Sequence, residues 1–561
     1  MKLYIFLSFL IVAGCSQQTS RTNTVGILAD SAMVVSAHPL ASHVGATILR
    51  KGGNAVDAAI ATQFALAVVY PSAGNIGGGG FMVLRQKDGT ATTLDYREKA
   101  PAAASAIMYL DSAGEVLEDL SARGHLASGV PGTVAGLAEA HVKYGSLPWK
   151  DLVQPAIDIA LKGFVLTERE AKSLNNLQED LKEFNSIEPT FLIKEWKGGD
   201  SIFYTDLGHT LERIRDNGAA GFYEGKTADD LVAEMQRGNG LITHQDLKTY
   251  KATWREPLRF KYKEYNVISM GPPSSGGIAL AQLLKSVEPY PIAKWGHNSA
   301  PTVHLMTEAE RRAYADRSVY LGDPDFFDVP AEELLSPMYI AERMKNFNPE
   351  RATPSHEIKE GSIADHESKQ TTHLSVVDSK GNAVAVTTTL NDSYGSRVIV
   401  AGSGFFLNDE MDDFSVKPGV PNMYGAIGGE ANKIEPGKRM LSSMTPTILE
   451  KNGKLFMVVG TPGGTTIITS VFQTILNVIE HKMTMQEAVA AKRIHSQWLP
   501  DSIFAETGAL LADDSVSLSR LGHAIHLRTD GIGRVDAILV QPNGKLEGGA
   551  DPRGDDTAEG F

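Results

Sequence analysis

The chain has 561 residues, of which 42% are hydrophobic and 21% charged, proportions typical of a soluble globular protein with a sizeable core. A formal net charge of −14, with no basic stripe, argues against nucleic acid as a partner. Cys15 is the only cysteine, which excludes an internal disulfide, a thiol nucleophile in the folded body and a metal site built on cysteines.

The amino terminus is predicted to be an export signal. Lys2 precedes an apolar run over 3–12 that is too short to span a bilayer as a stable anchor. The residues before Cys15 resemble a bacterial lipobox, which implies a signal peptide of 1–14, acylation of Cys15 and a polar tether over 15–24. Ser16 fits release to the outer membrane, so we expect a periplasmic, lipid-anchored protein. The alternative is an ordinary secretory signal with an incidental cysteine.

The first half alternates helical and extended patterns. The spacing predicts a helix over 54–69, capped by Asn54, with one apolar stripe and an end at Pro71. Four glycines, 77–80, then lead into a strand over 81–84, which forms a hairpin with 91–96. No Lys-Ser/Thr follows these glycines and no helix begins there, so we reject a phosphate loop. A glycine run that enters a buried strand favours close backbone approach.

The remaining elements predict a layered α/β (α+β) fold with helices outside two sheets. Further helices are expected over 133–143, 152–161, 167–181, 227–235, 278–284, 300–318 and 337–344, with a strand over 262–270. Beyond residue 370 we expect strands over 372–378, 383–389 and 456–460, helices over 465–480 and 485–493, and a hairpin around 542–544.

The strand that begins near Thr371 follows a long polar run over 346–369 without a linker of its own. A three-residue loop, Ser379–Gly381, would pair Asp378 with Asn382 and therefore place Thr371 opposite Thr389. The Cβ atoms of such pairs lie about 4.5–5.5 Å apart, so the two hydroxyls are within hydrogen-bonding reach. A Thr-Thr pair is also common in ordinary sheets. A threonine becomes a nucleophile only beside a base, and a cut before Thr371 would supply an α-amine with a pKa of about 7.7–8.0.

The sequence that starts at Thr371 resembles the small subunit of γ-glutamyltranspeptidases, which are N-terminal-nucleophile hydrolases. The resemblance covers nearly all of 24–561. It is carried by segments in the family's order: 75–80, 95–98, 127–132, 371–378, 381–387, 407–414, 417–422, 441–447, 463–464 and 497–500. It implies a four-layer αββα sandwich made by two chains from one precursor.

The resemblance also implies the reaction. The precursor would cut itself between Gln370 and Thr371, giving a heavy chain of 25–370 and a light chain of 371–561. Thr371 would then attack the γ-carbonyl of a γ-glutamyl amide such as glutathione. Water or an acceptor amino acid or peptide would release the γ-glutamyl group. No metal or organic cofactor is expected, and the membrane is involved only through the lipid anchor.

Each remaining site residue takes a role from the family. The resemblance assigns the substrate carboxylate to Arg97, Ser442 and Ser443, the ammonium to Asn391, Glu410 and Asp413, the oxyanion to Gly463 and Gly464, the second threonine to Thr389 and a lid to Tyr424. Read without the family, Arg97 would be a surface ion-pair partner of Glu98 or Asp95. Asp413 would belong to a solvated acidic turn.

Other functions remain as alternatives. Asp413 favours γ-glutamyl over glutaryl substrates, and a lid at Tyr424 favours small substrates over poly-γ-glutamate. A cephalosporin (glutaryl) acylase, a poly-γ-glutamate-processing relative and a non-catalytic lipid-anchored binding protein nevertheless stay open. A serine hydrolase is disfavoured because Gly-x-Ser-x-Gly is absent. A zinc hydrolase is disfavoured because the segment that starts at His366 ends in Gln370 where the motif requires histidine.

Overall fold

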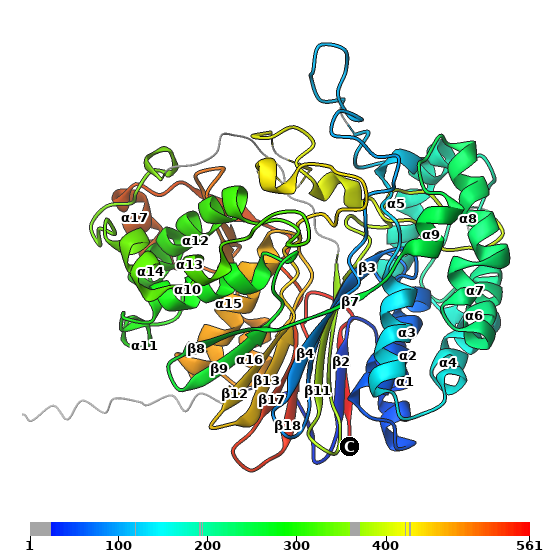
Figure 1. Cartoon of the computed structure of the whole chain (residues 1–561). Helices are drawn as coiled ribbons and strands as arrows, with labels where there is room; N and C mark the ends of the chain where they lie inside the picture. The colour runs from blue at the N-terminus through cyan, green and yellow to red at the C-terminus, as the bar shows by residue number, and fades with distance from the viewer. Residues whose placement is uncertain are drawn as a thin grey trace, which may run out of the picture.

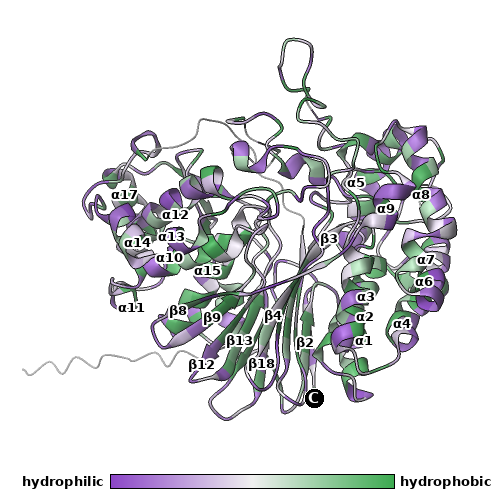
Figure 2. Ribbon diagram, in the orientation of Figure 1, coloured by the Kyte–Doolittle hydropathy of each residue, from purple (hydrophilic) through white to green (hydrophobic). Residues whose placement is uncertain are grey.

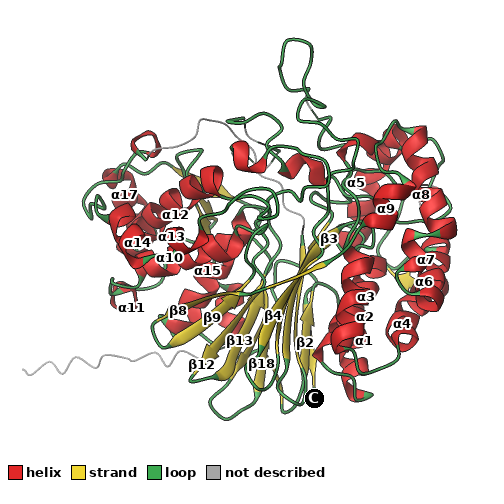
Figure 3. Ribbon diagram, viewed as in Figure 1, coloured by secondary structure: helices red, strands yellow, loops and turns green. Residues whose placement is uncertain are grey.

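The structure is a computed structural model that describes residues 24–117, 119–189, 192, 194–358, 371–420, 422–423, 425 and 428–561. The predictions for the signal peptide, Cys15, Gln370 and Tyr424 lie outside the described residues, as does all but the last residue of the tether. Two stacked sheets lie in the middle, with a helical layer on the outer face of each (Figures 1 and 3). The predicted arrangement of helices outside two sheets is confirmed.

Within the described residues, both sheets have seven strands, and every pairing in them is antiparallel. The first sheet has the order β1 (Ile27–Ala29), β18 (Leu546–Gly549), β17 (Asp536–Val540), β13 (Lys454–Gly460), β12 (Thr447–Lys451), β9 (Tyr265–Ser269) and β8 (Leu258–Tyr262). The second has the order β19 (Thr557–Gly560), β2 (Met33–Ser36), β10 (Thr372–Val377), β11 (Ala383–Thr389), β3 (Gly79–Arg85), β4 (Ala91–Asp95) and β7 (Thr253–Arg255).

Two helical layers cover the sheets. The layer over the second sheet contains α1 (Pro39–Arg50), α2 (Ala55–Val69), α3 (Thr133–Tyr144), α4 (Trp149–Lys162), α5 (Glu168–Phe184), α6 (Thr205–Asn217), α7 (Ala220–Tyr223), α8 (Gly225–Arg237) and α9 (His244–Thr249). The layer over the first contains α10 (Gly276–Val287), α11 (Ile292–Trp295), α12 (Ala300–Tyr320), α13 (Ala331–Leu334), α14 (Pro337–Met344), α15 (Thr466–Ile479), α16 (Met485–Ala490) and α17 (Ala512–Leu521). None of the helices in the described part of the chain is long and apolar enough to cross a membrane.

Smaller elements complete the fold. A three-stranded sheet joins β14 (Ile494–His495), β15 (Ile503–Glu506) and β16 (Ile525–Arg528), and a short ribbon joins β5 (Phe164–Val165) and β6 (Ser201–Ile202). The short 3₁₀ helices include η1 (His125–Ala127), η3 (Ser355–Glu357), η4 (Glu410–Asp413) and η5 (Glu430–Asn432).

The core is layered in the same way as the backbone. Inward-facing residues such as Val35, Phe81, Ala385 and Val458 pack between the two sheets. One larger apolar cluster lies between the second sheet and its helices, and another lies between the first sheet and its helices. Figure 2 shows the strands and the inner sides of the helices as the hydrophobic part of the molecule. The site described below therefore stands on a rigid, buried framework.

The two parts of the chain that meet at Thr371 are not separate bodies. Strands β10 and β11 come after residue 370, yet they lie between β2 and β3, which come before it. In the first sheet, four strands that follow residue 370 lie between β1 and β9, which precede it. A cut at residue 370 would therefore leave the two chains joined through both sheets.

Two sequence predictions need correction. Asn54 caps α2 through a capping box as predicted, but every residue from Ala55 to Val69 is buried, so the expected single apolar stripe is wrong. The predicted strand over 262–270 is observed as β9, but it begins only at Tyr265, because Tyr262 ends the preceding strand β8 and a turn separates the two. The turn places Lys263 at a φ of +50° without glycine, proline or asparagine to signal it.

Candidate active site

The hairpin β10–β11 brings the two threonines together in the predicted register. Thr372 pairs with Thr388, so Thr371 and Thr389 occupy the next opposing position. Gly381 closes the three-residue loop at a φ of +85° and its N–H donates to the carbonyl of Asp378 at 3.0 Å. Thr371 is buried at the inner end of this hairpin, with 5% of its surface exposed.

The glycine run packs directly against the second threonine. A Cβ on Gly78 would lie 2.1 Å from the carbonyl oxygen of Thr389, which only glycine avoids. The Asn75 side chain holds this contact, because its Nδ2 donates to the same carbonyl at 2.9 Å and its Oδ1 accepts from the N–H of Gly78 at 3.1 Å. The predicted close approach of backbones is confirmed.

A pocket of about 330 Å³ of empty space opens beside Thr371. Its walls include most of the predicted site residues: Arg97, Thr371, Thr389, Asn391, Glu410, Asp413, Ser442, Ser443 and Gly464. Arg317, Asn422, Met444, Thr465 and Ile467 complete the lining. Among the predicted residues, Gly463 adjoins Gly464, and Tyr424 lies outside the described residues.

Arg97 is the central charge of this pocket. Its side chain is 1% exposed and pairs with Glu410 at 2.5 Å and with Asp413. Glu98 lies farther away, at 3.5 Å from the guanidinium. The reading of Arg97 as a surface residue and of Asp413 as part of a solvated turn is therefore wrong. Arg97 therefore faces several carboxylates in a buried site.

This crowding controls the protonation of the acids. Burial raises the pKa of Glu98 to about 7, although the Arg97 guanidinium lowers it. Burial also raises the pKa of Glu410 and of Asp413, with Arg97 again acting in the opposite direction. Burial disfavours the charge on Arg97, but Glu410 and Asp413 more than offset this and raise its pKa. Burial thus opposes the charged forms of these acids, while the charge of Arg97 favours them.

A left-handed backbone conformation places Asn391 at the pocket. It adopts a φ of +81°, and its N–H donates to the Thr389 hydroxyl oxygen at 2.7 Å. Its side-chain amide donates to the carbonyl of Asp409 at 3.0 Å. The strained conformation ties the second threonine to the segment that carries Glu410 and Asp413.

A turn with two glycines faces the pocket at the start of α15. Gly463 and Gly464 have φ values of +137° and +54°, and their carbonyls accept from Thr466 and Ile467 in the first turn. Within the described residues, neither glycine N–H donates to any acceptor. Free N–H groups at a helix N-terminus are suited to stabilising an oxyanion.

Among the lining residues that sequence reasoning missed, two contact predicted site residues directly. Arg317, on the buried helix α12, donates from Nε to Ser275 at 2.9 Å and from Nη2 to the Ser443 hydroxyl at 3.1 Å. Asn422 donates from Nδ2 to Asp413 at 3.2 Å. The only available signal for Arg317 was the density of charges in 308–317, on a helix that turns out to be buried all round. Among the described residues, no group of acids, histidines or cysteines has the geometry to hold a metal ion.

Stacked antiparallel sheets between helical layers, with a threonine at the head of a central strand and a second hydroxyl opposite, define the class of N-terminal-nucleophile hydrolases. A sequence model described as γ-glutamyltranspeptidase matches residues 41–561. The chain belongs to the γ-glutamyltranspeptidase family.

Known relatives cover nearly the whole chain. A protein named glutathione hydrolase proenzyme from Pseudomonas aeruginosa is 49% identical over 94% of this chain and 94% of its own length. The protein of that name from Escherichia coli is 46% identical over 95% and 93%. Among solved structures, a cephalosporin acylase from Bacillus halodurans superposes with a TM-score of 0.86 at 27% identity, covering 98% of this chain and 99% of that one.

Proposed function

We propose that this protein is a glutathione hydrolase and γ-glutamyltransferase that uses Thr371 as its nucleophile. The observation that carries the proposal is one pocket in which Thr371 lies with a buried Arg97 and Asp413. A γ-glutamyl group ends in one carboxylate and one ammonium, so it requires a cation and an anion side by side. The pocket supplies both.

The free enzyme keeps these two charges paired with each other. Arg97 binds Asp413 and Glu410 directly. In our proposal the substrate carboxylate enters on the arginine side, with the Ser442 and Ser443 hydroxyls, and the ammonium enters on the Asp413 side, with Glu410 and Asn391. Buried ions are costly unless each has a partner, and an inserted zwitterion leaves every charge paired. A substrate without the ammonium would leave Asp413 short of a cation.

The chemical step follows from the hairpin. Once the chain is cut, the α-amine of Thr371 takes the hydroxyl proton while the hydroxyl oxygen bonds to the γ-carbonyl carbon. The N–H groups of Gly463 and Gly464 hold the oxyanion that forms. The amine then returns the proton to the leaving nitrogen, and a γ-glutamyl ester remains on Thr371. Water, or the amine of an acceptor, breaks that ester and restores the hydroxyl.

We propose that the same hydroxyl first cuts the chain. It attacks the carbonyl of Gln370, the C–N bond breaks so that the amide becomes an ester and the Thr371 amine is freed, and one water then hydrolyses the ester to release the Gln370 carboxylate and restore the Thr371 hydroxyl. Thr389 lies opposite and is proposed to position this hydroxyl. Because both sheets contain strands from each side of the cut, the heavy and light chains are expected to remain one body.

The proposal is tested with purified protein, glutathione and glycylglycine, with the products identified by mass. We expect glutamate and cysteinylglycine from glutathione alone, and γ-glutamyl-glycylglycine when the dipeptide is added. A protein that is correctly cut but leaves glutathione intact would refute the proposed substrate.

An acylase activity is the second candidate, because the structural similarity to a cephalosporin acylase is high. Asp413 argues for γ-glutamyl substrates, since its carboxylate needs the cation that glutaryl groups lack. A larger kcat/KM for glutaryl amides than for γ-glutamyl amides would reverse this preference.

We also propose that Cys15 carries a lipid that anchors the mature protein to the outer membrane. Only the sequence of residues 1–16 supports this. Mass analysis of the mature amino terminus tests it, with acylated Cys15 expected in wild type. Release of Cys15→Ala into the soluble fraction is the second expected result, and an unmodified Cys15 in the mature protein would refute the anchor.

A further inference from the structure

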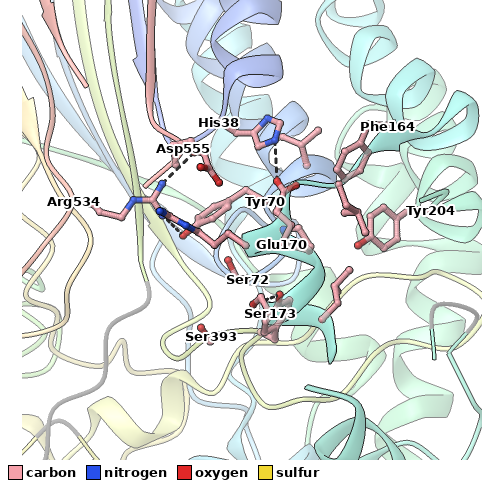
Figure 4. Close-up of a pocket in the computed structure, with 17 residues that line it drawn as sticks. His38, Tyr70, Ser72, Phe164, Glu170, Ser173, Tyr204, Ser393, Arg534 and Asp555 are labelled. Carbon is pink, nitrogen blue, oxygen red and sulfur yellow. Dashed lines mark hydrogen bonds and ion pairs between the residues drawn. The ribbon is translucent and has the colours of Figure 1, made fainter. Parts of the chain in front are cut away.

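A second cavity lies outside the catalytic pocket, at the junction of α5 with the ends of β2 and α2, the loop after β11 and the C-terminal segment. We call it the second cavity and define it by His38, Tyr70, Glu170, Tyr204 and Arg534 (Figure 4). It holds about 750 Å³ of empty space, part of it open to solvent, and among the described residues it shares no lining residue with the catalytic pocket. Concave sites lined by apolar side chains and a few polar groups are the usual places for small ligands.

One wall of the second cavity is apolar and aromatic. Val69, Pro71, Phe164, Leu174 and Tyr204 all line it. Phe164 and Tyr204 are tilted against each other with ring centroids 6.2 Å apart, which gives a firm surface. Such a wall takes up a hydrocarbon or aromatic group of a ligand.

Most polar groups around the second cavity are already paired. His38 lies 3.0 Å from Glu170, and Arg534 donates to the Tyr70 hydroxyl at 2.7 Å (Figure 4). Arg534 also donates to Asp556 at 2.8 Å, behind the cavity. These pairs fix the shape of the cavity and occupy most of its polar groups.

Two charged groups at the second cavity, Asp555 and Arg169, have hydrogen-bonding capacity that the described part of the protein does not use. Across the described chain, the Asp555 carboxylate accepts no hydrogen bond and forms no ion pair, although it faces the cavity beside Arg534 (Figure 4). Arg169 donates a single hydrogen bond, from Nη1 to the carbonyl of Arg553 at 2.7 Å, which places its guanidinium near the same segment. One carboxylate and one guanidinium with spare donors therefore lie at the same rim.

We propose that the second cavity binds a free α-amino acid with an apolar side chain. The ammonium pairs with Asp555, the carboxylate with Arg169, and the side chain packs on the wall formed by Phe164, Leu174 and Tyr204. A zwitterion satisfies both rim charges at once, whereas a simple amine or a simple acid leaves one of them without a partner.

The second cavity is joined to the catalytic pocket by two short segments. Tyr394, which lines the cavity at a φ of +61°, follows Asn391 in the same loop, and its N–H donates to the Ser72 carbonyl at 2.9 Å. The N–H of Arg534 donates at 2.7 Å to the hydroxyl of Thr461, just before the two glycines of the oxyanion turn. A ligand that moves either segment changes the catalytic pocket, and this coupling rests on the proposed function.

Binding is measured by calorimetry with three probes: L-phenylalanine, phenethylamine and 3-phenylpropanoate. We expect L-phenylalanine to bind wild type at least tenfold more tightly than either of the others. Asp555→Asn and Arg169→Gln should each weaken it tenfold or more, and Ser393→Trp should abolish it by filling the cavity. Asp513→Asn, a matched change on the exposed face of α17, should leave it unchanged.

A second comparison separates this site from the catalytic pocket. L-phenylalanine should bind Asp413→Asn as it binds wild type, because Asp413 belongs to the other pocket. No saturable binding to wild type, or binding that survives both Asp555→Asn and Ser393→Trp, would overturn the proposal. Binding lost in Asp413→Asn alone would assign the amino acid to the catalytic pocket and would also overturn it.

The coupling is read from glutathione hydrolysis, with γ-glutamyl-phenylalanine counted separately by mass. Saturating L-phenylalanine should change glutamate release at least twofold in wild type and leave Asp555→Asn unaffected. Equal responses of the two proteins would overturn the coupling. Loss of catalysis in every sample, with binding intact, would instead refute the proposed function.

Discussion

Replacing Asp413 with asparagine tests how the pocket recognises its substrate. The variant keeps the shape of the side chain and removes the anion that we propose for the substrate ammonium. Arg97 still has Glu410 at 2.5 Å and Glu98 at 3.5 Å, so the buried arginine is not left alone and the fold should survive. A hydrogen bond to a charged group contributes about 1.5–3 kcal/mol, which predicts a loss of about 10- to 150-fold in kcat/KM, mostly through KM.

The assay compares a γ-glutamyl anilide with the glutaryl anilide that lacks only the ammonium. Wild type should prefer the γ-glutamyl compound strongly, and Asp413→Asn should prefer it by only a few fold. Asp412→Asn is the matched control, because that carboxylate accepts from Ser121 at 2.6 Å and from the N–H of Met423 at 2.9 Å and does not line the pocket. An unchanged preference in Asp413→Asn would refute the assigned role, and so would an equal loss in both variants.

Three further variants test the framework of the site. Gly78→Ala should lower stability by about 1–3 kcal/mol, because the new Cβ meets the Thr389 carbonyl at 2.1 Å, whereas Gly271→Ala, with no atom within 4 Å, should be neutral in urea unfolding. Equal effects would contradict the packing argument. Burial lowers the pKa of His373 to about 3 in the folded protein. Below pH about 6.5 the unfolded chain therefore binds a proton at this histidine, whereas the folded protein does not. Stability should therefore fall on acidification, by about 2 kcal/mol between neutral pH and pH 5 for this residue, and His373→Asn should remove that part of the slope. An unchanged slope would show that the folded histidine is charged. Arg317→Ala should raise KM about tenfold with a smaller effect on kcat, and Arg317→Lys should restore part of the loss; no change in KM would remove Arg317 from the binding site.

The sequence allowed the catalytic hairpin to be predicted because its signals are local. Gly381 sets the loop, the loop sets the register, and the register places Thr371 opposite Thr389. The helix capped by Asn54 was predictable for the same reason, since the capping box spans only four residues. Local rules fail where backbone geometry has no residue-type signal, as at Lys263.

The charge pairing of the pocket could not be predicted from sequence. Arg97 meets Asp413 across more than 300 positions, and only the packing of the two sheets brings them together. Arg317 was missed because its helix is buried on all sides, so that no apolar stripe marks which of its charged residues face the pocket. The family resemblance supplied the roles of Ser442 and Ser443, which read alone would be a polar turn.

The most direct test of the account is whether Thr371 cuts its own chain. Wild-type protein and Thr371→Ala are purified in parallel and compared on a denaturing gel, with the amino terminus of the smaller product sequenced. We predict two bands for wild type, the smaller one beginning at Thr371, and a single uncut band for Thr371→Ala. A Thr371→Ala protein that is cut as completely as wild type, or a light chain that begins at another residue, would contradict the claim that Thr371 is the nucleophile.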